Sequence, residues 1–360
     1  MPCDYPKKAL LFPKKGGKHP KPQLISATQD VNSPDFIDFI IEKYGTTVYD
    51  NIELKCGKCK GCRLDRSKDW SIRLMHEKHI FPDAIFVTFT YDEDHLPANG
   101  TLVDTDFRLF MKRLRKKFQG VKSMKMPNGK IQNPIRYYMS GEYGTRRGRP
   151  HYHAIIFNFR PFDEVPCKQT PLNPVGDKFY TSAQLTKLWG KGYVNYSEVT
   201  QESCNYVAQY IMKKVGGEMA DNHYKRYVEP YTDPETGEIH DTIQLKPEFS
   251  AMTTQPGIGY FFYQKYPQML HPDIDRTSVR SKKGIKQVAV PRYYLKQLQK
   301  TNEEQAHLVT ERRRDKIEQS EAIDAQRVKD GLPSEKSYER RQVKRFLRDA
   351  TVKSLQRRLG

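Results

Sequence analysis

Two histidines separated by one residue, His151 and His153, introduce the apolar segment 154–157. Because alternate residues of a β-strand share a face, both imidazoles are expected to project to the same side. Glu142 precedes them, and the glycine- and arginine-rich turn at residues 144–150 can return it beside the histidines. Two imidazoles and a carboxylate are ligands for a divalent metal, and they leave coordination positions free for Lewis-acid chemistry on a phosphate. A His-x-His pair alone is a common incidental pattern, so this interpretation also depends on a second cluster.

The second cluster lies on a predicted helix. Residues 201–215 contain no Gly or Pro and precede a Gly-Gly pair, which predicts a helix that ends there. At about 100° per residue, Tyr206, Tyr210 and Lys213 form one stripe on this helix. Beside a metal-activated phosphodiester, a tyrosine can attack the phosphorus to give a phosphotyrosine, and a lysine can offset the developing negative charge. The alternative is two core tyrosines beside a solvated lysine pair.

These segments, taken in order, resemble the motifs of the microvirus replication initiators, which are rolling-circle endonucleases of the HUH (His-hydrophobe-His) family. The gokushovirus-type branch is the most similar. Residues 86–91 resemble the first strand motif of the family, residues 141–153 the metal-binding motif, and residues 206–214 the tyrosine motif. The cysteine-containing run 56–62 resembles a segment that precedes these motifs in the phage proteins. The middle residue of the His motif is Tyr152, which is only partly hydrophobic but leaves the ligands intact.

The resemblance implies an enzyme that nicks single-stranded DNA at a phage origin, with Mg²⁺ or Mn²⁺ held by Glu142, His151 and His153. One tyrosine would stay joined to the 5′ phosphate while the released 3′-OH primes rolling-circle synthesis. A second tyrosine would cut the regenerated origin, and rejoining of the unit-length circle would need no ATP. The implied partners are single-stranded or supercoiled origin DNA and a host helicase and polymerase, in the host bacterial cytoplasm. The residues expected to contact DNA are Arg146, Arg147, Arg149 and Lys214.

A cysteine cluster indicates a further metal site. Cys56, Cys59 and Cys62 form a C-x2-C-x2-C run in a Gly- and Lys-rich turn, where several sulfurs can converge on one ion. A structural Zn²⁺ site needs a fourth thiolate, for which Cys3 is the candidate. An iron–sulfur cluster and a disulfide are the alternatives. The usual C-x3-C-P continuation of an iron–sulfur motif is absent from the sequence, and a reducing cytoplasm disfavours a disulfide.

Composition indicates a polyanionic partner. The 360 residues include 62 Lys and Arg against 43 Asp and Glu, a formal net charge of +19, and the pI is about 9.5. This balance favours nucleic acid or a membrane surface. No run of 18 apolar residues predicts a membrane span, and the first residues lack the apolar core of a secretion signal. The 22 tyrosines suit stacking on single-stranded bases, although they also suit sheet faces.

The hydrophobic pattern predicts a mixed order of strands and helices, and hence an α+β fold. Strands are expected at 84–91, 135–142, 151–159 and 192–199, and helices at 36–44, 65–80, 105–118 and 182–189. The resemblance implies a ferredoxin-like antiparallel sheet of the HUH endonuclease type, with the His strand at its centre.

Four regions are expected along the chain. Residues 1–80 form a basic, Cys-containing N-terminal region with an extended loop at its start, and residues 81–217 form the nuclease core. Residues 218–300 form an aromatic-rich extension with few regular elements, which packs on the core. Residues 301–360 form a charged tail that is helical or partly disordered. The oligomeric state does not follow from the sequence.

Three other functions are alternatives. A plasmid-type initiator, relaxase or transposase would use the same chemistry, but the cysteine segment favours the phage class. A non-catalytic nucleic-acid-binding protein with an RRM-like sheet lacks support, because the sequence contains no RNP1-like run. A zinc-ribbon regulator leaves residues 84–214 without a role.

Overall fold

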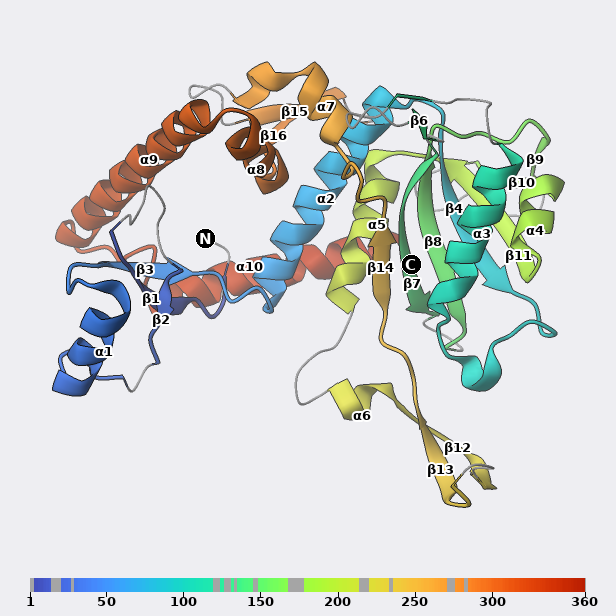
Figure 1. The fold of residues 1–360 in the computed structure, drawn as a ribbon, viewed down its shortest axis with the longest axis horizontal. Coiled ribbons are helices and arrows are strands. Elements are labelled where there is room, and N and C mark those ends of the chain that lie inside the picture. The colour runs from blue at the N-terminus through green and yellow to red at the C-terminus, as the bar shows by residue number, and fades with distance from the viewer. Residues whose placement is uncertain are drawn as a thin grey trace. The chain divides into compact units, whose positions relative to one another are not determined.

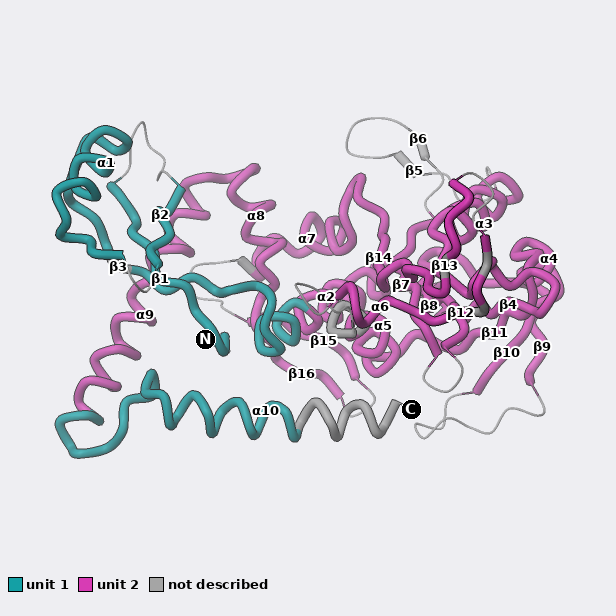
Figure 2. The backbone as a smooth tube through the Cα atoms, turned by 90° about the horizontal axis from the view of Figure 1, so that it is seen from below, with its two compact units in different colours: residues 1–66, 327–353 teal, residues 67–326, 354–360 magenta. Residues whose placement is uncertain are grey.

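The chain forms two compact units. The computed structural model describes residues 3–13, 21–26, 29–118, 124–125, 131–132, 135–144, 148–167, 178–213, 220–232, 236–270, 276–281 and 284–359. Unit 1 combines residues 1–66 with residues 327–353, and unit 2 combines residues 67–326 with residues 354–360 (Figure 2).

Unit 1 contains a small antiparallel sheet, in the order β2-β1-β3. Its elements are β1 (Lys7–Leu11), β2 (Gln23–Leu24), α1 (Pro34–Tyr44), β3 (Asp50–Leu54) and most of α10 (Tyr338–Leu359). The expected extended loop at the start of the chain is therefore partly wrong, because β1 pairs with both neighbouring strands and buries Leu10. The predicted helix at 36–44 is present as α1. Ser33 caps its first turn, and Gly45, with a φ of 70°, ends it.

Unit 2 is built on a seven-stranded antiparallel sheet, which confirms the α+β fold class (Figure 1). In spatial order its strands are β14 (Phe249–Met252), β7 (Arg136–Tyr143), β8 (Pro150–Phe157), β4 (Ala84–Tyr91), β11 (Gly192–Glu198), β10 (Tyr180–Ser182) and β9 (Glu164–Pro166). The His strand β8 is an interior strand, paired with β7 on one side and β4 on the other.

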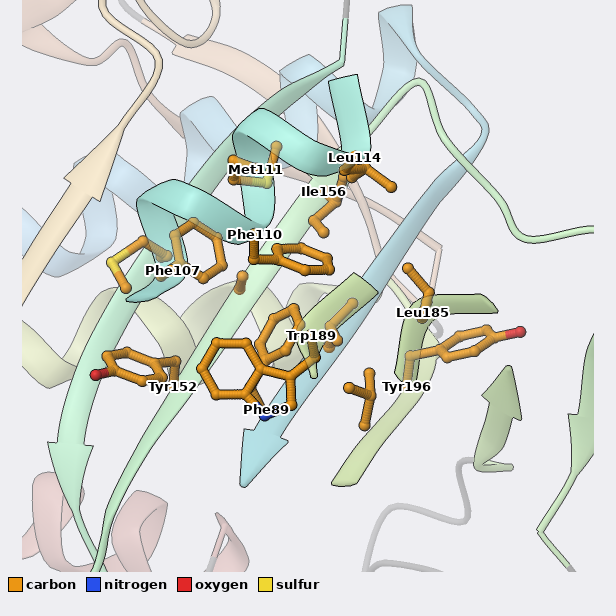
Figure 3. Packing of buried hydrophobic residues seen from close by; sticks show 14 of the residues in the cluster. Phe89, Phe107, Phe110, Met111, Leu114, Tyr152, Ile156, Leu185, Trp189 and Tyr196 are labelled. Atoms are coloured by element: carbon orange, nitrogen blue, oxygen red, sulfur yellow. The ribbon is translucent and has the colours of Figure 1, made fainter. Parts of the chain in front are cut away.

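One face of this sheet is covered by α3 (Asp104–Lys117) and α4 (Ala183–Trp189). The apolar stripe of α3, formed by Phe107, Phe110, Met111 and Leu114, is buried against the strands together with Trp189 of α4 (Figure 3). Tyr152 of β8 also points to this side and is fully buried. Its hydroxyl donates to the carbonyl of Val103 (2.7 Å) and lies 2.9 Å from the Tyr91 hydroxyl. A tyrosine is therefore accommodated in the middle of the His motif, because its ring packs in the core and its hydroxyl is satisfied.

The opposite face is covered by α2 (Lys60–Ile80) and α5 (Gln201–Lys213). Leu74 of α2 and Val207 of α5 pack there against Ile155 and Phe157 of β8. Because His151 and His153 have the same parity as Ile155 and Phe157, the histidines face α5 rather than α3. The helix α2 begins five residues earlier than the predicted residue 65, so that Cys62 lies in its first turn.

The region 218–300 contains more regular structure than its sequence indicated. Its remaining elements are α6 (Ala220–Tyr224), β12 (Lys225–Thr232), β13 (Ile239–Gln244), α7 (Tyr260–Lys265), η2 (Pro267–Leu270), β15 (Arg276–Ser281), β16 (Gly284–Ala289) and α8 (Arg292–Thr301). The strand β14 also comes from this region and extends the main sheet beside β7. At four residues it is too short to show a period of two.

The remaining elements are η1 (Ala98–Gly100), β5 (Met124–Lys125), β6 (Ile131–Gln132) and the long helix α9 (Glu303–Lys329). With α10, α9 gives the charged C-terminal region a helical structure. Among the residues that the structure describes, no helix has both the length and the apolar character needed to span a membrane.

Candidate active site

The register between β7 and β8 places Glu142 directly opposite His151, and Ser140 opposite His153. The connecting turn is closed by backbone hydrogen bonds from Gly144 N–H to the Arg149 carbonyl (2.9 Å) and from Gly148 N–H to the Gly144 carbonyl (2.9 Å). Gly148 has a φ of 61°, a left-handed conformation that glycine adopts without strain. The hairpin therefore returns the carboxylate beside the imidazoles, as the sequence predicted.

The three predicted ligands meet at one point. The Nε2 atoms of His151 and His153 lie 2.7 and 2.9 Å from the same carboxylate oxygen, Glu142 Oε1. Glu142 is 2% exposed and His153 is 6% exposed. Burial alone would raise the pKa of the Glu142 carboxyl, but hydrogen bonds from the two histidines hold this pKa far below its usual value. The carboxylate is therefore ionised and available to a cation.

The other nitrogen of each imidazole has its own partner. His151 Nδ1 lies 3.2 Å from the Arg149 carbonyl oxygen, and His153 Nδ1 lies 3.0 Å from the Thr88 hydroxyl. A metal-bound histidine usually makes such a contact through its second nitrogen, which fixes the orientation of the ring. One donor atom from each of Glu142, His151 and His153 lies within 4.8 Å of the others. This donor set fits a divalent cation bound through both Nε2 atoms and the carboxylate.

The tyrosine helix packs directly over this cluster. The ring of Tyr206 meets the ring of His153 edge-on, with centroids 5.1 Å apart and an interplanar angle of 84°. Two residues separate α5 from β11. Thr200 and Ser203 cap the helix reciprocally (Ser203 N–H to Thr200 Oγ1 3.1 Å, Thr200 N–H to Ser203 Oγ 2.9 Å). Tyr210 and Lys213 belong to the same helix, but their side chains lie outside the described part of the structure.

A polar network fixes α5 against α2. The Ser71 hydroxyl of α2 lies 2.6 Å from Asn205 Oδ1 and 2.5 Å from Gln201 Nε2 of α5. Asn205 precedes Tyr206, so this network determines where the tyrosine sits on the sheet. The sequence alone indicates no role for Ser71, Gln201 or Thr88. Period-two alternation places Thr88 on the face of Phe86, but only the β4–β8 register pairs it with His153.

The residues expected to contact DNA are only partly described. Arg149 forms an ion pair with Glu93 and donates to the Tyr91 carbonyl (3.1 Å), which ties the turn to the end of β4. DNA contact by Arg149 stays a prediction. Arg146, Arg147 and Lys214 lie outside the described residues.

The four predicted cysteines also converge. Cys3, Cys56, Cys59 and Cys62 each offer a sulfur within 4.8 Å of the others. Burial alone would raise the pKa of the Cys56 thiol, but backbone hydrogen bonds from Cys59 and Lys58 lower it to about 7. Burial raises the pKa of Cys62 to about 12. This second centre belongs entirely to unit 1.

Comparison with known proteins assigns the chain to a family. The family model of replication-associated protein ORF2/G2P matches residues 84–215, which include β4, the His strand and α5. The replication-associated protein VP4 of Bdellovibrio phage phiMH2K is 39% identical over 170 residues, or 47% of this chain and 51% of the relative. The replication-associated protein ORF2 of Spiroplasma virus 4 is 32% identical over 263 residues, which cover 72% of this chain and 71% of the relative.

A third relative, the replication-associated protein ORF4 of Chlamydia phage 1, is 33% identical over 182 residues, or 49% of this chain and 42% of the relative. The matches to the Bdellovibrio and Chlamydia phage proteins thus span about half of each relative. No solved structure matches the chain. The class defined by these relatives is the DNA-replication proteins of phages. The chain belongs to the family of phage replication-associated proteins of the ORF2/G2P type, the replication initiators of microviruses.

Proposed function

We propose that this protein nicks single-stranded DNA at a phage origin and starts rolling-circle replication through a covalent phosphotyrosine. The observation that carries the proposal is the convergence of Glu142, His151 and His153 beneath the ring of Tyr206. A divalent ion, Mg²⁺ or Mn²⁺, held by these three ligands would polarise the scissile phosphate. The HUH type of fold is part of the same proposal, and the antiparallel sheet with an interior His strand supports it.

In the proposed reaction, a phenolic oxygen forms a bond to phosphorus while the bond from phosphorus to the 3′ oxygen breaks. The phenol loses its proton, the 3′ oxygen gains one, and the 5′ phosphate remains on the tyrosine. The phosphotyrosine ester retains the energy of the broken bond, so a later attack by a 3′-OH closes the circle without ATP. Tyr206 is favoured as a nucleophile by its contact with His153, and Tyr210 by its Tyr-x-x-Lys spacing.

Partners follow from the same chemistry. The substrate would be single-stranded or supercoiled origin DNA, and the released 3′-OH would be extended by a host polymerase behind a host helicase, in the host cytoplasm. The net charge of +19 supports binding to a phosphate backbone. A non-catalytic RRM-like protein would have no use for a buried carboxylate held between two imidazoles.

The test is a nicking assay. Labelled single-stranded oligonucleotides, tiled across the genome that encodes the protein, are incubated with Mn²⁺ and analysed on a denaturing gel for a protein–DNA adduct. His153→Ala should lower nicking by roughly 10³-fold or more, because it removes a ligand. Thr88→Val should raise the Mn²⁺ concentration needed for half-maximal nicking by roughly 10- to 100-fold. It removes the hydroxyl that orients the His153 ring but leaves the three ligands in place.

The matched control is His307→Ala, which removes an exposed histidine of α9 and should leave nicking unchanged. All variants should bind single-stranded DNA about as well as the native protein, because the basic surface dominates affinity. A His153→Ala protein that nicks at the native rate would overturn the assignment of the site.

A further inference from the structure

A cluster of four thiols in unit 1 lies outside the proposed nuclease chemistry. Cys3 comes from the start of the chain, Cys56 and Cys59 from the loop after β3, and Cys62 from the first turn of α2. Cys3 and Cys62 are buried, and Cys56 and Cys59 are half-buried. All four are free thiols. We propose that they form a tetrathiolate site for one Zn²⁺, and that this site also fixes the C-terminal helix α10 to the N-terminal segment.

The spacing of the sulfurs fits zinc. With a Zn–S bond of about 2.3 Å, the edge of a tetrahedral tetrathiolate is about 3.8 Å. The Sγ atoms of Cys56 and Cys62 are 4.0 Å apart, as are those of Cys3 and Cys59. These separations are far longer than a disulfide bond. They are also short for a four-iron cluster, in which each cysteine binds a different iron atom and the sulfurs stand further apart.

The backbone around the cluster is arranged to stabilise sulfur anions. The N–H groups of Cys59 and Cys62 point to the Sγ atoms three residues earlier, at 3.3 Å from Cys56 and 3.4 Å from Cys59. The N–H of Cys56 points to Cys3 Sγ, and the N–H of Asp4 points to Cys59 Sγ, both at 3.3 Å. Amide N–H groups aimed at sulfur favour thiolates, which are the form that binds the metal.

The first ligand is followed by a residue that reaches α10. The Asp4 carboxylate accepts a hydrogen bond from Gly61 N–H (3.4 Å), and Gly61 lies between the ligands Cys59 and Cys62. Its other oxygen lies 2.5 Å from Nη2 of Arg348 on α10. This ion pair is largely buried, with side-chain exposures of 7% for Asp4 and 11% for Arg348. Removing one partner of a buried pair is strongly destabilising, so the pair makes α10 depend on the position of residues 3 and 4.

Further contacts extend the same attachment. Arg345 of α10 donates to the Tyr5 hydroxyl (3.2 Å). Asp349 of α10 forms an ion pair with Lys60 at the start of α2, with 3.6 Å between Oδ2 and Nζ. Every residue involved belongs to unit 1. A metal that crosslinks residue 3 to residues 56–62 thus fixes the segment on which α10 rests. Loss of the metal is expected to free both the N-terminal segment and the helix.

The metal content is measured first. The full chain, purified without a histidine tag, is analysed by inductively coupled plasma mass spectrometry, and about one zinc per chain is expected. Cys59→Ser should retain less than about 0.2 zinc per chain. The matched control Cys167→Ser, a half-buried thiol outside the cluster, should retain the full amount. Cobalt substitution of the native protein should give the intense visible bands of tetrahedral thiolate coordination, a readout that does not depend on whether the variants fold.

The attachment of α10 is measured by limited trypsin digestion. Zinc chelation of the native protein, and Cys59→Ser, should each raise the rate of cleavage in α10 several-fold. Arg348→Ala should raise this rate while zinc stays bound, because it removes only the link to the helix. The matched control is Arg314→Ala, which removes an exposed arginine of α9. It should change neither the rate of cleavage in α10 nor the amount of bound zinc.

Several outcomes would overturn the proposal. Native protein without zinc, iron with acid-labile sulfide in its place, or full zinc in Cys59→Ser would each remove the tetrathiolate site. Unchanged cleavage of α10 after zinc removal would remove the link to the helix. This inference is independent of the proposed nicking. His153→Ala should keep its zinc while losing activity, so failure of either proposal is recognised separately.

Discussion

At the scale of single residues, the site combines three side chains that could hold a metal ion with a tyrosine whose ring contacts one of them. The β7–β8 register places the Glu142 carboxylate beside the two imidazoles. Contacts with the Thr88 hydroxyl and the Arg149 carbonyl orient the imidazole rings. Because the rings are already oriented, the proposed cation would bind without reorganising the strands. The proposed nucleophiles lie on a different element, α5, so substitutions of the tyrosines and of the proposed ligands can be made independently.

The paired tyrosines give a prediction at this scale. Tyr206 and Tyr210 are one helical turn apart, so both phenols are expected to serve the same phosphate. Tyr206→Phe and Tyr210→Phe should each retain nicking through the other phenol but fail to sustain repeated cycles of replication. The double variant should fall below about a thousandth of native activity, because phenylalanine fills the same space without a nucleophile. Nicking and adduct formation are measured on denaturing gels, and a covalent adduct in the double variant would contradict the mechanism.

At the scale of elements, the helix α2 joins the sheet to the region 250–300. Its Glu77 is fully buried, pairs with Arg136 of β7 and accepts a hydrogen bond from Gly259 N–H (2.6 Å). Its Arg73 lies between the rings of Trp70 and Tyr293, at 3.9 and 3.8 Å from their centroids. These buried charges have well-placed partners, so they fix the position of α2.

His76, one helical turn after Arg73 on α2, contacts residues of α7, α8 and β15. It stacks on Phe262 at 3.7 Å, and its two nitrogens lie 2.8 Å from the Tyr294 hydroxyl and 3.1 Å from the Ser278 carbonyl. Burial lowers the pKa of His76 to about 4. An unfolded histidine has a pKa of about 6.5. Between about pH 4 and pH 6.5, residue 76 is therefore protonated in the unfolded chain but neutral in the folded one. The stability held by neutral His76 is therefore complete above about pH 6.5 and is lost as the pH falls towards 4.

This pH dependence can be measured. Between pH 7.5 and pH 5, the histidine alone should lower the free energy of unfolding of the native protein by about 2 kcal/mol. Between the same two pH values, the free energy of unfolding of His76→Gln should fall by about 2 kcal/mol less than that of the native protein, because glutamine does not bind a proton. The control is His307→Gln, an exposed histidine of α9, which leaves the contacts of His76 in place and should keep the native pH dependence. Urea unfolding at the two pH values gives the comparison, and equal losses in His76→Gln and the native protein would show that His76 contributes nothing.

At the scale of the whole molecule, the net charge of +19 is expected to dominate encounter with DNA. Neutralised phosphates release counterions, so affinity for a single strand should fall steeply with salt. A tenfold or larger loss is expected between about 50 and 200 mM salt if roughly three phosphates are neutralised. Fluorescence anisotropy of a labelled oligonucleotide measures it. His153→Ala should show the same salt dependence, and an affinity that does not change with salt would exclude a phosphate-dominated interface.

The sequence by itself determined the features that depend on local periodicity and residue chemistry. The period-two spacing of His151 and His153, the buried stripe of α3 and the C-x2-C-x2-C run were each predictable, because each needs only residues close together in the chain. The α+β class and the membership of the phage replication proteins followed from the order of these motifs.

Tertiary structure alone decided which distant residues meet. Thr88 reaches His153 only through the β4–β8 register, and β14 joins the sheet beside β7 although its sequence gave no strand signal. The return of α10 to Asp4 joins opposite ends of the chain. The structure also brings Cys3, which the sequence could only name as a candidate, to the cysteine run. Local patterns specify which face a residue takes on its own element. They do not specify which element lies opposite, because that choice is made by packing many side chains at once.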